Sequence, residues 1–351
     1  MTAHDRSFTE SPFAEANPTL PTALGNDDDD ESDVAAEYFR PEQATRPGRR
    51  GRRPAFRDAS ETDDGRIVSE LTEAGEVAGY RMTYRPARFE SVWLRASLRS
   101  FYDQELIVDV QAQIKGGKEA NVYRCLAHPR TGAELLAAKV YRPRKFRNLS
   151  NDSLYREGRP VLTGDGRPVK PTDQRIMRAL GKKTEFGVQV QHTSWLMYEY
   201  TTLERVHGAG GAVPRPVGAN ENAILMGYQG DARRAAPALQ EVSLGSRTAR
   251  SLFREVLRNV ELLLQHGLVH GDLSAYNILY WDGHVTLIDF PQATLVHANR
   301  NAFAILQRDV KRVCDYFARQ GVREDPVAIA EELWERFGEL DYGEPDVLEG
   351  S

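Results

Sequence analysis

The segment from His270 to Phe290 constrains the fold more than any other part of the chain. Its sequence is HGDLSAYNILYWDGHVTLIDF, so an Asp-Gly pair lies between two short apolar runs. Such a pair predicts a β-hairpin with a tight turn at Asp282 and Gly283. The hairpin separates the polar residues Asp272 and Asn277, which precede it, from Asp289, which follows it.

Composition indicates an ordinary globular protein, with 40% apolar and 28% charged residues. The net charge of −5 does not predict general nucleic-acid binding, so any such contact needs a local patch. The two cysteines exclude a disulfide scaffold and a cysteine-based metal site, and they fit a reducing cytoplasm. We expect no secretory signal and no apolar run that could span a membrane.

Residues 1–65 differ from the rest of the chain because they are poor in apolar residues and carry charge in blocks. An acidic run at Asp27–Glu31 precedes a basic run at Gly48–Pro54, and neither has helical or strand periodicity. We therefore predict a disordered tail. The basic run is a candidate RNA or acidic-surface contact, and a solvated linker explains it equally well.

Residues 66–226 are expected to form a first lobe built on an antiparallel sheet. An amphipathic helix follows Pro86, with its apolar side chains at Phe89, Val92, Trp93 and Ala96. Alternating residues then predict strands over 106–114, 121–127 and 135–141. The segment 142–183 has no clear periodicity and carries twelve Lys and Arg against four Asp and Glu, a local charge of +8. We predict a basic flexible loop there.

Residues 227–351 are expected to form a second, mostly helical lobe. A helix over 195–206 and a strand over 223–226 lead into it. A long apolar stripe between Leu252 and Leu264 predicts a helix that Gly267 ends, and a last helix carries Val310 to Phe317. The prediction is an α+β fold with two lobes and a cleft between them.

Three polar residues around the hairpin have the chemistry of a phosphoryl-transfer site. Asp272 can accept a hydroxyl proton, and Asn277 and Asp289 offer the oxygen ligands that Mg²⁺ prefers. Their spacing matches the catalytic and metal-binding loops of protein kinases. A structural role for His270 with both acids on solvated turns is the alternative, and the ordered set of motifs disfavours it.

The first lobe supplies a lysine of matching character. Lys139 lies in the apolar run AAKVY, where an ammonium group is costly to bury unless it meets an anion. Its expected carboxylate partner is Glu199 or Glu204, and the physics of the sequence does not choose between them. The turn Lys115–Tyr123 contains Gly116 and Gly117, which let the backbone approach phosphate, and Lys118, which adds charge.

These residues together resemble the RIO family of atypical protein kinases. The resemblance is carried by GKEANVY, AAKVY, LVHGDLSAYNILY and LIDFPQA, over about residues 86–320. It implies a trimmed bilobal kinase fold that uses ATP with Mg²⁺ or Mn²⁺. It also implies phosphorylation of serine or threonine, and a link to maturation of the small ribosomal subunit.

The resemblance also implies a role for each site residue. Asp272 would be the catalytic acid/base, Asn277 and Asp289 would bind metal, and Ser274 replaces the lysine of conventional kinases. The family's Trp-x₃-Glu helix matches Trp195 and Glu199, which favours Glu199 over Glu204. The expected ATP-binding residues are Gly116, Gly117, Lys118, Glu119, Asn121, Val122, Lys139, Glu199, Met226, Gly227 and Gln229.

Four functions remain open from the sequence. The first is a cytoplasmic serine/threonine protein kinase that modifies a protein substrate or itself. The second, which the resemblance implies, is an ATPase switch that phosphorylates its own Asp289 while bound to a ribonucleoprotein. The contact with the ribonucleoprotein would be made by the basic segments 48–54 and 142–183. A small-molecule phosphotransferase and a nucleotide-binding scaffold without turnover are the third and fourth. None of these requires a membrane.

Overall fold

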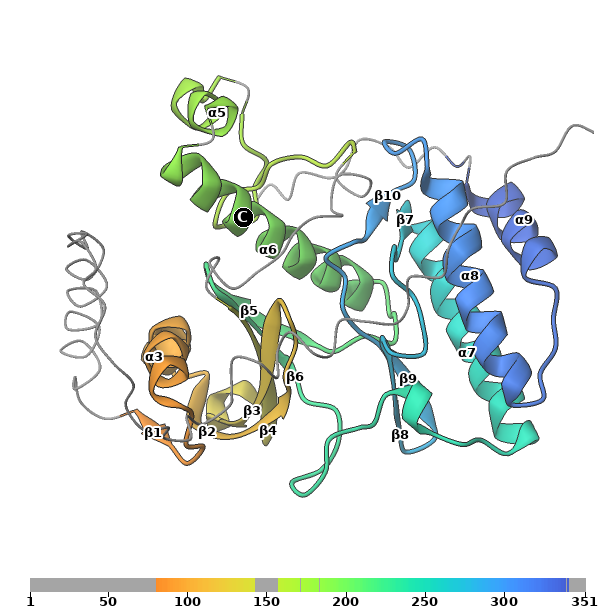
Figure 1. Cartoon of the computed structure of the whole chain (residues 1–351), viewed down its shortest axis with the longest axis horizontal. Helices are drawn as coiled ribbons and strands as arrows, with labels where there is room; N and C mark the ends of the chain where they lie inside the picture. Colours follow the sequence, from red (N-terminus) through yellow and green to blue (C-terminus); the bar gives the residue numbers. More distant parts are fainter. Residues whose placement is uncertain (1–79, 143–156, 171, 183, 339, 341–351) are drawn as a thin grey trace, which may run out of the picture. The chain divides into compact units, whose positions relative to one another are not determined.

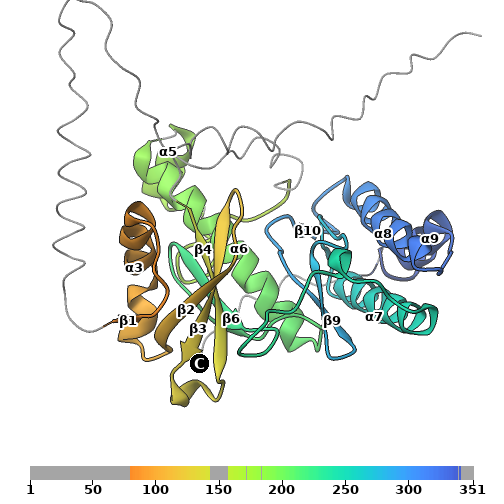
Figure 2. The same ribbon diagram turned by 60° about the horizontal axis from the view of Figure 1, so that its bottom comes forward.

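The computed structural model describes residues 80–142, 157–170, 172–182, 184–338 and 340 (Figures 1 and 2). The predicted tail 1–65, with its basic run 48–54, lies outside the described residues. So does the stretch 143–156 of the predicted basic loop.

The first lobe contains a six-stranded sheet of order β1-β2-β3-β4-β6-β5. Its strands are β1 (Arg81–Met82), β2 (Ile107–Lys115), β3 (Ala120–Ala127), β4 (Leu135–Tyr141), β5 (Pro216–Ala219) and β6 (Ala223–Gly227). A short 3-10 helix, η1 (Pro129–Thr131), joins β3 to β4. Only β1 and β2 pair in parallel, so the predicted antiparallel meander is confirmed.

Strand alternation divides the side chains of β4 between two faces of the sheet. Leu136, Ala138 and Val140 pack with α3 (Arg88–Asp103), the helix that the sequence predicted after Pro86. The intervening positions place Lys139 and Tyr141 on the opposite face, toward α6 and the second lobe. The period of two therefore decides that Lys139 faces the cleft.

The described part of segment 142–183 is not one loop, so that prediction is wrong for residues 174–181, which form α5 (Gln174–Gly181). The Asp173 side chain accepts a hydrogen bond from the Ile176 amide at 3.1 Å and caps the helix. The apolar residues of α5 are few and are interrupted by charged residues, so the sequence shows no clear apolar stripe there. A Cβ on Gly187 would lie 2.1 Å from the Ala179 carbonyl oxygen, so α5 packs closely on the next helix.

That next helix, α6 (Glu185–Gly208), begins ten residues before its predicted start at Trp195. Thr184 caps it by accepting a hydrogen bond from the Gly187 amide at 3.1 Å. The additional turns are rich in polar residues, which gave no apolar stripe to detect. Figure 1 shows α5 beside the first turns of α6.

The second lobe is mostly helical, as predicted. Its elements are η3 (Leu239–Glu241), α7 (Ser246–Gln265), β7 (Leu268–Val269), β8 (Ile278–Trp281), β9 (His284–Leu287), β10 (Thr294–Leu295), α8 (Ala302–Arg319) and α9 (Pro326–Phe337). The hairpin is confirmed: Asp282 and Gly283 have φ of 47° and 86°, as a tight turn between β8 and β9 requires. Helix α9 was not predicted, although Asp325 caps it and Pro326 begins it.

Two hydrophobic clusters form the core of the described chain. The smaller joins the sheet to α3, and the larger joins α6 to α7, α8 and the hairpin. The α+β, two-lobed fold is therefore confirmed, with α6 packed against the second lobe. Among the described helices, none is both long and apolar enough to cross a membrane.

Candidate active site

A cavity of about 690 Å³ lies between the sheet of the first lobe and the β8–β9 hairpin of the second lobe. Most of the predicted site residues line it: Gly117, Lys118, Glu119, Val122, Lys139, Glu199, Met226, Gly227, Gln229, Asn277 and Asp289. Four predicted residues do not, namely Gly116, Asn121, Asp272 and Ser274. The cavity also has a wall that the sequence did not indicate, formed by residues 234–238 after the end of β6.

Lys139 connects the two lobes inside this cavity. Its Nζ lies 2.6 Å from Glu199 Oε1 on α6 and 2.6 Å from Asp289 Oδ1 after β9. Tyr141 donates a hydrogen bond from its hydroxyl to the other oxygen of Glu199. The predicted ion pair with Glu199 is thus confirmed, whereas Glu204 is exposed on α6.

The electrostatics of this cluster favour charged Lys139. Burial opposes the ammonium, but the carboxylates of Asp289 and Glu199 outweigh it and hold the pKa of Lys139 well above its usual value. Burial also opposes the Asp289 carboxylate, and Lys139 outweighs it and lowers the pKa of Asp289. Burial, with Asp289 nearby, raises the pKa of Glu199 against the effect of Lys139. Lys139 and Asp289 therefore form a charged link between the lobes.

The backbone at Asp289 is held in an uncommon conformation. Its φ of 73° lies in the left-handed region, which costs a non-glycine residue free energy unless its surroundings impose it. The next side chain, Phe290, is 1% exposed and packs on the His270 ring with centroids 4.6 Å apart. This packing helps to hold the Asp289 carboxylate toward Lys139.

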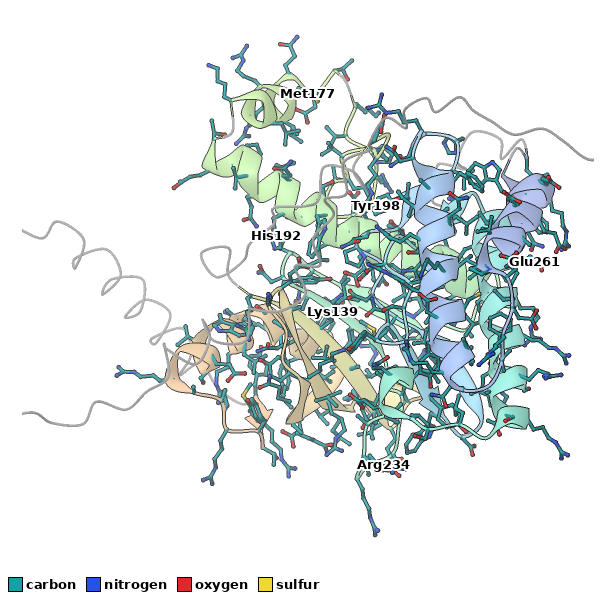
Figure 3. All side chains as sticks on the ribbon, turned by 45° about the vertical axis from the view of Figure 1, so that its right-hand side comes forward. Lys139, Met177, His192, Tyr198, Arg234 and Glu261 are labelled. Atoms are coloured by element: carbon teal, nitrogen blue, oxygen red, sulfur yellow. The ribbon has the colours of Figure 1, made fainter. Side chains whose placement is uncertain are left out.

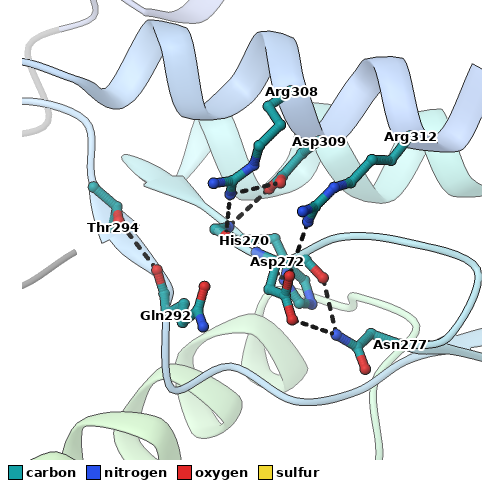
Figure 4. A network of polar contacts seen from close by, with 9 residues as sticks. His270, Asp272, Asn277, Gln292, Thr294, Arg308, Asp309 and Arg312 are labelled. Carbon is teal, nitrogen blue, oxygen red and sulfur yellow. Dashed lines mark hydrogen bonds and ion pairs between the residues drawn. The ribbon is translucent and has the colours of Figure 1, made fainter. Parts of the chain in front are cut away.

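The loop of Asp272 is held by hydrogen bonds from its own lobe (Figure 4). Asn277 Nδ2 donates to Asp272 Oδ2 at 3.0 Å and to its carbonyl oxygen at 2.9 Å. Arg312 Nη1, from α8, lies 2.9 Å from Asp272 Oδ1. Both carboxylate oxygens therefore have a donor, and the carboxylate has a defined orientation.

His270 supports this loop as a neutral side chain. Its Nδ1 accepts a hydrogen bond from the Asp272 amide at 3.3 Å, and its Nε2 lies 3.2 Å from the Ile288 carbonyl oxygen. A proton on Nε2 alone satisfies both contacts. Burial lowers the pKa of His270, which is consistent with this neutral form.

Helix α8 anchors the same loop through residues that the sequence reasoning missed. The Gly271 amide donates to Asp309 Oδ2 at 2.8 Å, and Arg308 donates to the Gly271 carbonyl oxygen. Gly271 has φ of +86°, and a Cβ there would lie 2.0 Å from the Gln292 carbonyl oxygen, so only glycine fits. The available signal was Asp309, a buried acid on the apolar face of an amphipathic helix.

The side chains of Asn277 and Asp289 fit one divalent cation. In the described part of the chain, no hydrogen bond occupies Asn277 Oδ1 or Asp289 Oδ2, and both side chains line the cavity. The described residues contain no cluster of three His, Cys, Asp or Glu for a protein-only cage. Two protein oxygens suit a cation that also binds phosphate and water.

The glycine turn between β2 and β3 is organised by Asn121. Its Oδ1 accepts hydrogen bonds from Arg142 Nη2 at 3.1 Å and from the Gly117 amide at 3.4 Å. Its Nδ2 donates to the Tyr123 hydroxyl at 3.0 Å. A Cβ on Gly117 would lie 2.8 Å from the Ala120 carbonyl oxygen. Asn121 therefore fixes the shape of the turn. Two residues of this turn, Lys118 and Glu119, line the cavity.

The strand end at β6 provides a backbone donor. The Gly227 amide already donates to the Arg215 carbonyl oxygen at 2.8 Å, and the Gln229 carbonyl oxygen accepts from the Ala236 amide at 2.9 Å. Within the described residues, the Gln229 amide has no hydrogen-bond acceptor. It is thus available to a planar ligand in the cavity.

Comparisons with known proteins agree with this geometry. The family model of the RIO domain matches residues 169–329, which include Glu199, Asp272, Asn277 and Asp289. A protein of Thermoplasma acidophilum named RIO-type serine/threonine-protein kinase Rio1 is 31% identical over 137 residues, covering 39% of this chain and 70% of that protein.

Two longer matches extend the similarity. The RIO-type serine/threonine-protein kinase Rio1 of Haloferax volcanii is 34% identical over 213 residues, 60% of this chain and 64% of the relative. The serine/threonine-protein kinase RIO1 of Chaetomium thermophilum is 30% identical over 239 residues, 65% of this chain and 43% of the relative. The chain thus spans less than two thirds of these two relatives. With the two lobes, the Lys139 link and the loops of Asp272 and Asp289, these matches show that the chain belongs to the RIO-domain family.

Proposed function

We propose that the protein is an ATP-dependent serine/threonine protein kinase of RIO type, transferring the γ-phosphate to a protein or to itself. The observation that carries the proposal is Lys139, bonded at 2.6 Å to both Glu199 and Asp289 inside a 690 Å³ cavity. The Lys139 ammonium lies between two carboxylates, and Asn277 Oδ1 accepts no hydrogen bond from the described residues. This arrangement suits a bound metal–phosphate group.

Each wall of the cavity has a proposed task. The adenine lies at the strand end, against Met226, and hydrogen-bonds with the backbone of Gly227 and Gln229. The turn with Gly116, Gly117 and Lys118 covers the phosphates, with Glu119, Asn121 and Val122 shaping it, and Lys139 contacts them. Asn277 and Asp289 hold Mg²⁺ or Mn²⁺, which offsets the phosphate charge.

Asp272 is the proposed acid/base. The acceptor hydroxyl oxygen forms a bond to the γ-phosphorus, its proton goes to an Asp272 oxygen, and the bond to the β–γ bridging oxygen breaks as ADP leaves. Because each carboxylate oxygen has a second lone pair, Asp272 keeps its bonds to Asn277 and Arg312 meanwhile. Ser274 stands where conventional kinases have lysine, and the cation that pairs with Asp272 among the described residues is Arg312.

A second candidate is the ATPase switch with an aspartyl-phosphate. It is favoured by the Asp289 side chain, which is 40% exposed and whose Oδ2 has no hydrogen-bond donor in the described part of the chain. This oxygen would attack the γ-phosphorus, ADP would leave, and water would then cleave the acyl phosphate.

The experiment that separates these functions follows radiolabelled γ-phosphate from ATP. We expect label on a protein acceptor or on this chain as acid-stable phosphoserine or phosphothreonine. Hydroxylamine-labile label with steady phosphate release would favour the ATPase switch. Label on an added aminoglycoside would indicate a small-molecule phosphotransferase, and nucleotide binding without any transfer would leave a scaffold.

We further propose a cytoplasmic protein that contacts RNA of a ribonucleoprotein through segments 48–54 and 142–183. Support comes from α5 and its C-cap, where Arg175, Arg178 and Lys182 are exposed. Reversing these charges to glutamate should lower the salt dependence of single-stranded RNA binding by about 0.7 per lost contact. The matched control reverses Arg247, Arg250 and Arg254, which are exposed on α7. An equal loss in both triple variants would contradict a specific role of α5.

A further inference from the structure

The segment 157–162 lies between α6 and the chain that follows Asp289. At one end, Glu157 pairs with Arg300 at 3.3 Å and accepts a hydrogen bond from Asn301 at 3.3 Å, just before α8. At the other end, Leu162 is 5% exposed, and its amide donates to Ser194 Oγ on α6 at 2.9 Å. The segment is therefore attached to both sides.

Gly158 allows this segment to pack closely on the second lobe. Its φ is +77°, and a Cβ there would lie 2.3 Å from the Ala298 Cβ and 2.5 Å from the Ala298 carbonyl oxygen. Any other residue would push the segment away or strain the backbone. This close contact keeps the next residue, Arg159, within reach of the second lobe.

Arg159 contacts both elements that carry the carboxylates around Lys139. Its Nη1 donates to the Pro291 carbonyl oxygen at 2.8 Å, and its Nη2 donates to the Ala293 carbonyl oxygen at 2.6 Å. Its guanidinium carbon lies 4.3 Å from the centroid of the Tyr198 ring on α6, and Figure 3 shows Tyr198 on that helix. The planar fork suits two carbonyl oxygens and an aromatic face at once.

The two contacts are adjacent in sequence to the site. Tyr198 directly precedes Glu199, and Pro291 follows Asp289 by two residues. The left-handed backbone of Asp289 needs support from its surroundings, and Arg159 bonds two of the three carbonyl groups that follow Phe290, those of Pro291 and Ala293. Arg159 itself does not line the cavity.

We propose that Arg159 is a positioning residue that holds α6 and the loop after Asp289 in one arrangement, so that Glu199 and Asp289 both reach Lys139. This inference rests on the proposed function for its catalytic consequence. Without Arg159, the loop 289–293 is released from α6, and Asp289 is lost as an oriented ligand before Glu199 is.

The first test measures hydrogen–deuterium exchange without nucleotide. Arg159→Ala should increase amide exchange over residues 289–296 and leave the β2–β4 sheet unchanged. Faster exchange throughout the chain would indicate a general structural role and overturn the proposal. Arg167→Ala is the matched control, because Arg167 is an exposed arginine that pairs with Asp165 in the same part of the chain.

The second test measures binding of a non-hydrolysable ATP analogue as a function of Mn²⁺ concentration. Arg159→Ala should raise the Mn²⁺ concentration for half-maximal binding several-fold and leave metal-free binding unchanged. Arg159→Lys should recover part of the loss, because an ammonium reaches one carbonyl oxygen at a time. Tyr198→Leu, which keeps the arginine, should give a smaller shift in the same direction.

Turnover is measured separately, and we expect kcat of Arg159→Ala to fall roughly 10- to 100-fold, as a small misplacement of a reacting group costs. Wild-type exchange and wild-type Mn²⁺ dependence in Arg159→Ala would overturn the inference. Metal-dependent binding without phosphoryl transfer by the wild-type protein would refute the proposed function alone, because the exchange and binding tests do not need transfer.

Discussion

The loop of Asp272 and the loop of Asp289 carry the two central acids of this site, and they are held in different ways. The Asp272 loop is bonded to its own lobe, by Asn277 and by Arg308, Asp309 and Arg312 of α8. The Asp289 loop also contacts its own lobe, through the His270 ring beside Phe290, but its carboxylate and two of its carbonyl groups bond to Lys139 on the sheet and to Arg159 before α5. Asp272 is thus positioned by one lobe, whereas the position of Asp289 depends on both.

The positions of the two acids are therefore sensitive to different movements of the molecule. A shift of the sheet would move Lys139 and affect Asp289 first, while Asp272 would keep its hydrogen bonds to Asn277 and to Arg312 on α8. The half of the site that holds the proposed metal ligand Asp289 is therefore the half that depends on the relative position of the lobes.

Removing the Asp272 carboxylate should give the largest effect on turnover. Asp272→Ala should lower kcat by about 10²- to 10⁴-fold, the usual contribution of a general acid or base. ATP affinity should stay the same, because Asp272 does not line the cavity. Steady-state transfer and nucleotide binding by fluorescence measure the two quantities, and near-normal turnover would remove Asp272 from the mechanism.

Removing Lys139 should disturb the other loop. Lys139→Ala should lower kcat/KM for ATP by roughly 10²-fold, since it deletes a cation from a site that stabilises phosphate charge. Unlike Asp272→Ala, it should also weaken metal-dependent nucleotide binding, because Asp289 loses its partner in the sheet. A pure kcat effect with unchanged binding would contradict the dependence of Asp289 on both lobes.

The carboxylate on α6 provides a finer test of the same link. Glu199→Gln should reduce activity less than Lys139→Ala, because Asp289 still holds the lysine. Glu204→Gln is the matched control on the exposed side of α6 and should have no effect. A damaging Glu204→Gln with a silent Glu199→Gln would show that the wrong acid has been assigned.

Arg312 tests the anchoring of the Asp272 loop. Arg312→Ala should lower kcat about threefold to tenfold, below the full value of a charge-assisted hydrogen bond, because both side chains are more than a third exposed. The KM for ATP should not change. Lys311→Ala, which removes a neighbouring exposed ion pair with Asp315, is the control. Equal losses in both variants would indicate a nonspecific effect on α8.

The smallest expected effect is a pH dependence of stability from His270. Its folded-state pKa is lowered by burial, so its contribution is present above about pH 6.5, the ordinary value, and is lost as the pH falls below it. The slope should reach at most about 1.4 kcal/mol per pH unit. Urea unfolding at pH 7.5 and 5.5 measures it.

The contribution of His270 is the difference in the pH dependence of stability between wild type and His270→Asn. This difference is needed because burial raises the pKa of the adjacent Asp309, which makes stability increase as the pH falls. His284→Gln, in a 79% exposed position, is the control for the loss of a histidine from the same lobe. An identical slope in His270→Asn would contradict the neutral, buried role.

Local patterns predicted much of the fold. The strand alternation that contains Lys139, the Asp282–Gly283 turn and the apolar stripe of α7 depend on residues close in sequence, and each is confirmed. The early turns of α6 and the short α5 were missed, because their stability comes from caps at Asp173 and Thr184 and from close packing at Gly187.

The order of residues along the chain is enough to predict a lysine on an inner strand, and two acids and an asparagine around a hairpin. The folded arrangement is what brings Lys139 to Glu199, 60 residues away, and to Asp289, 150 residues away. It also brings α8 to Asp272 and Arg159 to the loop after Asp289. Side-chain periodicity reports which face of an element is buried, whereas ion pairs between distant elements depend on how the helices and the sheet pack, which no local pattern encodes.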